Sequence, residues 1–426
     1  MSRPAVQCVI LGGGEGRRLF PLTKTRCKPA VPVGGKYRLV DVALSNCIHS
    51  GYNRIYLLTQ YHTRSLHRHI RDTYHFDSFA GGFVEVLSAE LVCGRSPAWY
   101  EGTADAVRKN LDYLQLKEDD LVLILAGDHL YRMDFAPMVA AHLRSGAEVT
   151  VSAKLVPAHR ICQFGAIEVD ENLRIVRFVE KPDNPEEVHR LQVHPDIAHR
   201  FGLPPSPSTP NCLASMGNYI FRFGALRSAL AGTDNDFGKN VLPGLVAQQI
   251  PVGAYLFDGY WEDLGTIRSF FDANIALTDI LPPFDFFDAE RPIFTTPRYL
   301  PASKVNGCSM EQVVMADGCL IDRAILRRCM VGTCAVIRQG SLLENVLMMG
   351  NDFFEKRHGP DGTIPCGIGR NCHIRNAIVD KNVRIGDRVR ISPEGKPNGY
   401  TNGECVVVDA IACVPNGATL PNDFIF

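Results

Sequence analysis

The stretch Val6–Leu19, VQCVILGGGEGRRL, joins an apolar run to a loop rich in glycine. Its first part, Val6–Leu11, predicts the first strand of a sheet. Glycines directly after a strand let backbone N–H groups close around phosphate oxygens. Arg18 in the loop and Lys28, nine residues beyond Leu19, add the positive charge that a polyphosphate leaving group needs. The pattern therefore indicates a site where a nucleoside triphosphate binds and is cleaved.

A glycine-rich loop after a strand is often only a tight turn, and this one matches neither common phosphate signature. It does not read GxxxxGK[ST], because no Ser or Thr follows a lysine at that spacing, which excludes the P-loop. It also lacks the G-x-G-x-x-G spacing that continues into a helix, with an acidic residue about 20 residues on. What indicates function is the combination of the glycines with Arg18 and Lys28.

Length and composition predict two or three domains and no nucleic-acid partner. The chain has 426 residues, and a domain takes roughly 150. Its formal net charge of −1 leaves no basic surface of the kind that nucleic acid requires. No apolar run reaches the ~18 residues that a membrane span needs. We therefore expect neither nucleic acid nor a membrane among its partners.

The cysteines are numerous but scattered. There are 14 of them and no C-x-x-C, so a zinc site is not expected. Cys8, Cys47 and Cys319 fall at apolar-looking positions, where free cysteine behaves as a small hydrophobic residue. The first strand begins at Val6, which leaves no room for a signal or transit peptide before it. We expect a cytoplasmic location and reduced thiols.

From Val6 to about Asp258, β-rich runs alternate with segments of helical periodicity. This alternation predicts an α/β fold, Rossmann-like, with a mostly parallel sheet and helices on both faces. Ligands in such sheets bind beyond the carboxyl ends of the strands. The expected strands are Ile55–Thr59, Leu121–Ala126, Val149–Leu155, Ile175–Val179 and Tyr219–Phe223, and the expected helices are Val40–Ser50, Thr103–Gln115, Phe135–Ser145 and Ile267–Leu277.

The period then changes. The proline-rich segment 281–301 predicts a linker. Beyond it, apolar residues recur every six positions: Val313, Cys319, Ile325, Val331, Ile337, Leu343 and Met349, then Ala377/Val379, Val383/Ile385 and Val389/Ile391. Period six is the hexapeptide signature of a parallel β-helix, which we expect to be left-handed. The predicted domains are 1–280 and 302–426, and a coil of this kind usually stacks or supports oligomers.

Acidic residues follow the expected strands at the same edge. Asp128 ends the buried run Leu121–Gly127, and a carboxylate facing a triphosphate is a natural Mg²⁺ ligand. Mg²⁺ takes one or two carboxylates, and Glu262 and Asp263 offer a second one. The competing role for Asp128 and Asp263 is that of a turn or helix-capping residue.

Other residues suit a phosphorylated sugar and a nucleotide. Lys181, after Glu180 at a strand end, can hold a phosphomonoester, although a solvated surface lysine is the alternative. Gly102-Thr103 begins a helix whose N–H groups can face a ligand. Gly165 and Ser215 precede strands, where small residues allow close backbone approach. Together the parts describe attack of a phosphate ester on the α-phosphorus of a nucleotide, with release of pyrophosphate.

The motifs also resemble those of a known family, the ADP-glucose pyrophosphorylases (glucose-1-phosphate adenylyltransferases), over nearly the whole chain. The matching stretches are Leu11–Leu22, Lys28–Asp41 (KPAVPVGGKYRLVD), Leu44–Cys47, Trp99–Val107 (WYEGTADAV), Ile124–Asp134 (ILAGDHLYRMD), Phe178–Pro182, Ala214–Tyr219, Tyr260–Thr266 and Gly367–Gly386. The chain looks closer to the plant and cyanobacterial branch than to enteric-type members.

The resemblance implies Mg²⁺-dependent synthesis of ADP-glucose from ATP and glucose 1-phosphate, feeding glycogen or starch. It also implies a tetramer, here a homotetramer, regulated by phosphate-ester effectors. By motif, Arg18 and Lys28 fall on ATP-phosphate positions and, with Asp128, on catalytic ones, and Asp128 and Asp263 fall on the metal-binding aspartates. The implied nucleotide contacts are Leu11, Gly12, Gly13, Gly14, Gly102 and Thr103, and the implied glucose 1-phosphate contacts are Tyr100, Gly165, Glu180, Lys181 and Ser215.

Two departures from the family pattern concern charge. Plant-type members carry an activator-binding lysine in a run resembling Val406–Pro415, and here that run has none. Lys381 matches the second activator lysine, and Lys36 can supply a different anion site. Arg17 stands where threonine is usual. Two alternatives stay open: another sugar nucleotidyltransferase making a UDP-, dTDP- or GDP-sugar, and a regulatory subunit without catalysis.

Overall fold

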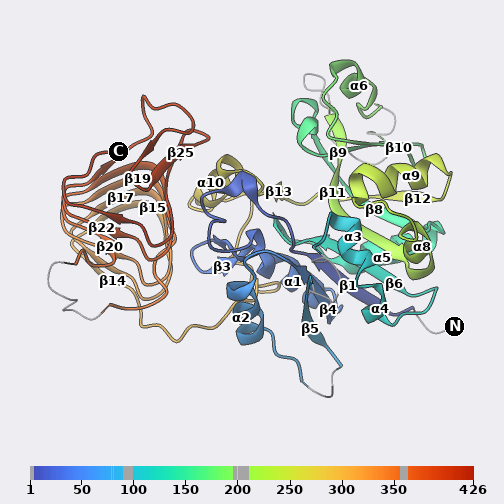
Figure 1. The fold of residues 1–426 in the computed structure, drawn as a ribbon, viewed down its shortest axis with the longest axis horizontal. Coiled ribbons are helices and arrows are strands. Elements are labelled where there is room, and N and C mark those ends of the chain that lie inside the picture. Colours follow the sequence, from blue (N-terminus) through green and yellow to red (C-terminus); the bar gives the residue numbers. More distant parts are fainter. Residues whose placement is uncertain are drawn as a thin grey trace.

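The protein has two parts that lie side by side, an α/β part and a β-helix (Figure 1). The computed structural model describes residues 4–77, 79, 81–89, 99–194, 199, 211–355 and 363–426. The α/β part is built on a nine-stranded sheet in the order β10-β9-β11-β6-β1-β4-β5, with β8 beside β11 and β12 beside β8. Its strands are β1 (Val6–Leu11), β4 (Arg54–Thr59), β5 (Phe83–Ser88), β6 (Leu121–Ala126), β8 (Val149–Pro157), β9 (Gly165–Val169), β10 (Ile175–Glu180), β11 (Asn211–Arg222) and β12 (Val252–Leu256).

The predicted α/β class with a mostly parallel sheet is confirmed. Strands β5, β4, β1 and β6 pair in parallel, and so do β12 and β8. Strand β11 runs antiparallel to β6, β8 and β9, and β10 runs antiparallel to β9. Among the described strands of this sheet, all except β10 and β11 therefore point the same way, and the carboxyl ends of β1, β4 and β6 meet at one edge.

Helices cover both faces of this sheet, because side chains alternate between two apolar clusters along each strand. In β1, Cys8 and Ile10 face one cluster and Val9 faces the other. The helices are α1 (Leu39–His49), α2 (Arg64–Thr73), α3 (Thr103–Arg108), α4 (Leu111–Leu114), α5 (Phe135–Ser145), α6 (Pro185–Arg190), α8 (Phe223–Ala229), α9 (Leu242–Ala247) and α10 (Ile267–Ala276), with 3-10 turns η1 (Arg17–Leu19), η2 (Lys28–Ala30) and η3 (Ala158–Gln163) and a π-turn η4 (Phe237–Val241).

One predicted helix is divided. The helix expected over Thr103–Gln115 is two short helices, α3 and α4, with Asn110 between them. The Asn110 amide donates to the Ala106 carbonyl at 2.7 Å and to the Tyr100 hydroxyl at 3.0 Å. Asparagine side chains compete with the helix for backbone groups in this way, so the prediction of one continuous helix was wrong.

The C-terminal part is the predicted parallel β-helix. Its strands stack in parallel, β15-β17-β19-β21 on one face and β14-β16-β18-β20-β22-β27 on another. Their bounds are β14 (Lys304–Asn306), β15 (Ser309–Met315), β16 (Leu320–Asp322), β17 (Ile325–Val331), β18 (Val336–Ile337), β19 (Leu342–Met348), β20 (Gly367–Ile368), β21 (His373–Val379), β22 (Arg384–Ile385), β23 (Arg390–Ile391), β24 (Thr401–Asn402), β25 (Cys405–Val408), β26 (Ile411–Val414) and β27 (Thr419–Leu420).

The six-residue repeat misplaces two residues, because Ile325 is exposed and Met349 belongs to the interface with the α/β part, while Met348 faces the interior of the coil. Ser309 pairs with Ile325, which pairs with Leu342, so successive turns of the coil take 16 and 17 residues. Three hexapeptides would take about 18. The shorter turn shifts the inward position by one residue, and Leu326 is fully buried while Ile325 is 41% exposed.

The two parts share one apolar interface. Met330, Leu347, Met349 and Ile378 of the β-helix belong to the same cluster as Leu19 and other residues of the α/β part. Helix α10 lies between the sheet and the β-helix and contacts β17 and β19 (Figure 1).

Two further features concern membrane-spanning helices and the cysteines. Within the described ranges, no helix combines the length and apolar character needed to cross a bilayer. The cysteines in these ranges are free thiols, and most of them are buried, including Cys8, Cys47 and Cys319.

Candidate active site

A cavity of about 400 Å³ opens beyond the carboxyl ends of β1 and β6. The sequence predicted a ligand site at this end of the sheet, because ligands bind beyond the carboxyl ends of parallel strands. The cavity brings together twelve of the residues that the sequence singled out, from five separate regions of the chain: Leu11, Gly13, Gly14, Arg18, Lys28, Tyr100, Gly102, Thr103, Asp128, Glu180, Lys181 and Asp263.

Three of the expected contacts do not line the cavity. Gly12 directly follows β1, and its N–H donates to the Leu58 carbonyl at 2.8 Å. Gly165 packs against Phe178 and Glu180 instead of facing the space. Ser215 is buried, and its hydroxyl accepts a hydrogen bond from the Gly217 N–H at 3.3 Å.

Other lining residues escaped the sequence analysis. They are Leu58, Gln60, Ala106, Ala126, His129, Tyr219, Asp236 and Gly238, whereas the lining residue Gly217 belongs to the stretch Ser215-Met216-Gly217, whose small residues the sequence indicated for close backbone approach. A signal existed for Gln60, which directly follows β4 and so lies at the same edge as the glycine loop. Asp236 and Gly238 follow no strand of the sheet, and only the tertiary fold brings them here.

Lys28 lies between two carboxylates at the floor of the cavity. Its Nζ is 2.5 Å from Asp128 Oδ2 and 3.3 Å from Asp263 Oδ1. Burial alone would lower the pKa of Lys28, but the two negative charges outweigh it and raise that pKa. Burial alone would raise the pKa of Asp128, but attraction by Lys28 outweighs it and holds that pKa at about 2. Lys28 and Asp128 are therefore both charged at neutral pH.

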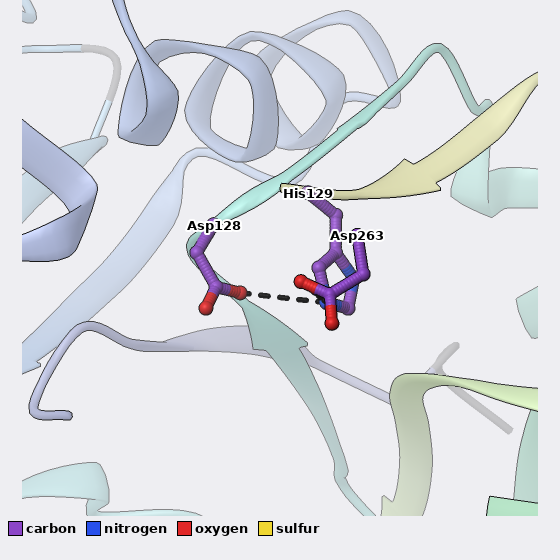
Figure 2. A group of neighbouring side chains, drawn as sticks. All are labelled: Asp128, His129 and Asp263. Atoms are coloured by element: carbon purple, nitrogen blue, oxygen red, sulfur yellow. Dashed lines mark ion pairs between the residues drawn. The ribbon is translucent and has the colours of Figure 1, made fainter. Parts of the chain in front are cut away.

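A two-stranded ribbon brings the two acids together. Strand β7 (His129–Tyr131) pairs antiparallel with β13 (Trp261–Asp263), so that His129 lies opposite Asp263 and Tyr131 opposite Trp261. Asp128 immediately precedes β7. The ligand atoms of Asp128, His129 and Asp263 lie within 4.8 Å of one another (Figure 2).

This donor set fits Mg²⁺. Two carboxylates beside a phosphate-binding loop are the arrangement in which Mg²⁺ keeps open positions for substrate phosphates and water. Asp128 and Asp263 supply these oxygens, and the Lys28 ammonium balances part of their negative charge at close range. The imidazole of His129 is a ligand better suited to softer metals.

The carboxylate of Glu180 packs closely against two glycines, Gly165 and Gly238. A Cβ added to Gly238 would lie 2.6 Å from Glu180 Oε2, and one added to Gly165 would lie 2.9 Å from the same atom. No carbon approaches an oxygen this closely, so side chains at either position would displace the carboxylate. Gly165 therefore acts on the cavity through Glu180.

Lys181 has an unusual backbone conformation. Its φ is +50°, in the left-handed region, although Pro182 follows and disfavours anything but an extended conformation before it. The Lys181 N–H donates to the Phe164 carbonyl at 2.9 Å, which fixes this turn. Such conformations cost on the order of 1–3 kcal/mol and concentrate at functional sites. Here the turn aims the half-exposed Lys181 ammonium at the cavity, 3.3 Å from Glu180 Oε1.

Gly102 is required by a close backbone approach. A Cβ at this position would lie 2.1 Å from the Asn235 carbonyl oxygen. That oxygen accepts hydrogen bonds from the N–H groups of Ala104 and Asp105 at the start of α3. The loop before η4 is thereby tied to the start of α3 at the edge of the cavity.

The two lysines expected to bind effectors lie outside this cavity. Lys36 lines a separate cavity of about 320 Å³ between the α/β part and the β-helix, with its Nζ 5.6 Å from the centre of the Tyr37 ring. Lys381 Nζ is 2.5 Å from Asp352 Oδ1 at the β-helix surface that faces the α/β part. Burial lowers the pKa of Lys381. Arg17 pairs with Glu15 and does not line the active-site cavity.

Comparison with known families matches both parts of the chain. Residues 7–280 match the model of the nucleotidyl transferase family, and residues 298–425 match that of the GLGC left-handed parallel beta-helix domain. The first match covers more than half of the chain and the cavity lies entirely within it. The chain belongs to the nucleotidyl transferase family, and the combination of its two domains indicates the glucose-1-phosphate adenylyltransferase family.

Proposed function

We propose that the protein transfers the adenylyl group of ATP to glucose 1-phosphate, forming ADP-glucose and pyrophosphate. The observation that carries this proposal is the group of Lys28, Asp128 and Asp263 beside the glycine loop, with Lys181 in the same cavity. One end of the cavity thus suits a triphosphate and the other a phosphomonoester. The resemblance of the motifs to ADP-glucose pyrophosphorylases, with the closest likeness to the plant and cyanobacterial branch, supports the choice of nucleotide and sugar.

In this proposal the reaction needs no covalent nucleophile. An oxygen of glucose 1-phosphate attacks the α-phosphorus of ATP, and the bond to the bridging oxygen of pyrophosphate breaks. Arg18 and Lys28 stabilise the negative charge that develops on the phosphates. Lys181 and Glu180 hold the sugar phosphate in line for attack. Mg²⁺ bound by Asp128 and Asp263 supplies further charge neutralisation on the phosphate oxygens.

The deciding experiment is pyrophosphate release by the purified chain with Mg²⁺ and glucose 1-phosphate. ATP, UTP, dTTP and GTP are compared in parallel. Turnover restricted to ATP supports the proposal, whereas preference for another nucleotide assigns the chain to a different sugar nucleotidyltransferase. Absence of turnover with every nucleotide, in a folded protein, points to a regulatory subunit that acts only with a catalytic partner.

Regulation and assembly form the second part of the proposal. We propose a cytoplasmic homotetramer that supplies glycogen or starch synthesis and responds to phosphate-ester effectors through Lys381 and Lys36. The missing lysine in the run Val406–Pro415 speaks against strong control by 3-phosphoglycerate. The assay is therefore repeated with 3-phosphoglycerate, fructose 6-phosphate, fructose 1,6-bisphosphate, AMP and phosphate. Light scattering gives the oligomeric state, and a monomeric active enzyme would contradict the tetramer.

A further inference from the structure

His129 is one of the three residues at the candidate metal site, and its imidazole ring accepts a hydrogen bond from the indole of Trp261. The Trp261 Nε1–H donates to His129 Nδ1 at 3.2 Å, and the two rings meet edge-on at 85°. An indole nitrogen can only donate, so Nδ1 must accept. In a neutral imidazole the remaining proton is then on Nε2.

The protonated nitrogen faces the two acids. His129 Nε2 lies 3.5 Å from Asp128 Oδ1 and 3.6 Å from Asp263 Oδ1 (Figure 2). Both distances exceed those of a direct hydrogen bond, so the N–H points between the carboxylates without being consumed by either. A nitrogen that carries a proton has no lone pair to offer a metal.

The pairing of β7 with β13 brings His129, Trp261 and Asp263 together, and Asp128 directly precedes β7. Trp261 and Asp263 are two residues apart on β13, so their side chains lie on one face of the ribbon. His129 is directly opposite Asp263, and Trp261 is its diagonal neighbour. Trp261 itself is buried, and its ring packs against that of Phe164 at 4.9 Å. The indole is therefore a rigid support for the imidazole.

We propose that His129 is a positioning residue and not a metal ligand, because Trp261 fixes its ring so that the Nε2–H faces Asp128 and Asp263. The inference rests on the proposed Mg²⁺-dependent function. Of the three residues in the group, only the two carboxylates then bind the cation. His129 orients them by donating toward their oxygens, and this outer contact sets their geometry.

The first test is the position of the proton, observed by long-range ¹H–¹⁵N NMR on the full chain labelled with ¹⁵N-histidine. The His129 signals are assigned by their absence in His129→Gln. We expect the Nε2–H form in the native chain and a mixture of both forms in Trp261→Phe, which keeps an aromatic ring but removes the donor. An Nδ1–H form in the native chain would overturn the proposal.

The second test uses Mn²⁺ without substrates, so that it does not depend on turnover. Glutamine places an N–H near the position of Nε2, and His129→Gln should keep the Mn²⁺ affinity within about two-fold. His129→Ala lacks the donor and should bind at least about ten-fold more weakly, as should Asp263→Asn, which loses a ligand. Thermal unfolding of each variant checks that it is folded.

Electron spin-echo spectroscopy of the bound Mn²⁺ detects whether a histidine nitrogen coordinates the metal directly. We expect no directly coordinated nitrogen in the native chain. A coordinated histidine nitrogen, or a His129→Gln variant as weak as Asp263→Asn, would show that His129 is a ligand. A chain that binds Mn²⁺ as expected but releases no pyrophosphate with any nucleotide would keep this inference and refute the proposed function.

Discussion

Arg26 donates to Asp380 at 2.9 Å across the interface between the two parts of the protein, with both side chains buried. Arg26 precedes the cavity-lining residue Lys28 by two positions, and Asp380 precedes Lys381 in the β-helix. The ion pair therefore joins the start of η2 directly to the β-helix. Burial raises the pKa of Asp380, against the attraction of Arg26, so the carboxylate depends on its partner.

We expect Arg26→Ala to destabilise the protein strongly. The substitution leaves the Asp380 carboxylate buried without its partner, a change that costs about 3–5 kcal/mol. Chemical denaturation followed by circular dichroism measures the loss. Because a raised carboxyl pKa penalises the charged form in the folded state, the loss should grow as the pH rises above the ordinary aspartate range.

The matched control is Arg388→Ala. Arg388 pairs with Asp423 in a fully exposed position of the β-helix. Surface ion pairs contribute little, so its unfolding midpoint should stay near that of the native chain. Equal destabilisation by both substitutions would contradict the role given to the buried pair.

We expect Lys28→Met to abolish turnover while preserving the fold. Methionine keeps the length and burial of the side chain but removes the ammonium that lies between Asp128 and Asp263. Loss of one preorganised charge at a phosphoryl-transfer site costs about 100-fold or more in kcat. Pyrophosphate release under saturating ATP and glucose 1-phosphate gives this number.

Arg17→Thr serves as the control for charge in the same loop. Arg17 is exposed and pairs with Glu15, so its removal should change kcat less than about two-fold. A loss with Arg17→Thr as large as with Lys28→Met would mean that the loop acts through its total charge and not through the contact of Lys28 with the two acids.

The pH dependence of the free energy of unfolding should report the ion pair between Lys28 and Asp128. The pKa of Asp128 is about 2 in the folded protein, below its ordinary value of 3.8. A lowered carboxyl pKa stabilises the fold above pH 4, and this contribution of about 2 kcal/mol is lost as the pH falls from 4 to 2. Lys28→Met should lack this part of the acid loss. Denaturation curves of both proteins between pH 5 and 2 compare the slopes, and parallel slopes would contradict the assignment.

The sequence predicted the sheet edge because each strand there carries its own local signal. Val6–Leu11 and Leu121–Ala126 are buried runs that end in a glycine loop and in Gly127-Asp128, and parallel strands bring such ends together. The interior of the β-helix was equally readable from its repeat. Ile325 was misplaced because the length of one turn of the coil, 16 residues here, depends on corner geometry that the repeat does not encode.

The sequence did not predict contacts between residues that only nonlocal packing brings together. Gly238 and Gly165 meet at Glu180 from segments far apart in sequence, and neither has a motif that names Glu180 as its neighbour. His129 was visible in the motif ILAGDHLYRMD, but its role depends on Trp261, which only the pairing of β7 with β13 places beside it. Sequence patterns thus locate the site, and cross-strand and loop contacts define its chemistry.

The last prediction concerns Gly165 and Gly238, the two glycines that pack against Glu180. Gly238→Ala puts a methyl group 2.6 Å from Glu180 Oε2, and the carboxylate must move because the π-turn backbone around Gly238 is fixed by hydrogen bonds to Asp236. We expect the KM for glucose 1-phosphate to rise about ten-fold or more, since misplacing one positioning group costs on this scale, while the KM for ATP changes little.

Gly244→Ala is the matched control, because a Cβ at Gly244 in α9 meets no atom within 4 Å. Alanine favours a helix over glycine by roughly 0.5–1 kcal/mol, so this variant should be slightly more stable and kinetically unchanged. Initial rates over a matrix of both substrate concentrations separate the two KM values. A rise in the KM for ATP instead would place Glu180 on the nucleotide side of the cavity and reverse the assignment of its two ends.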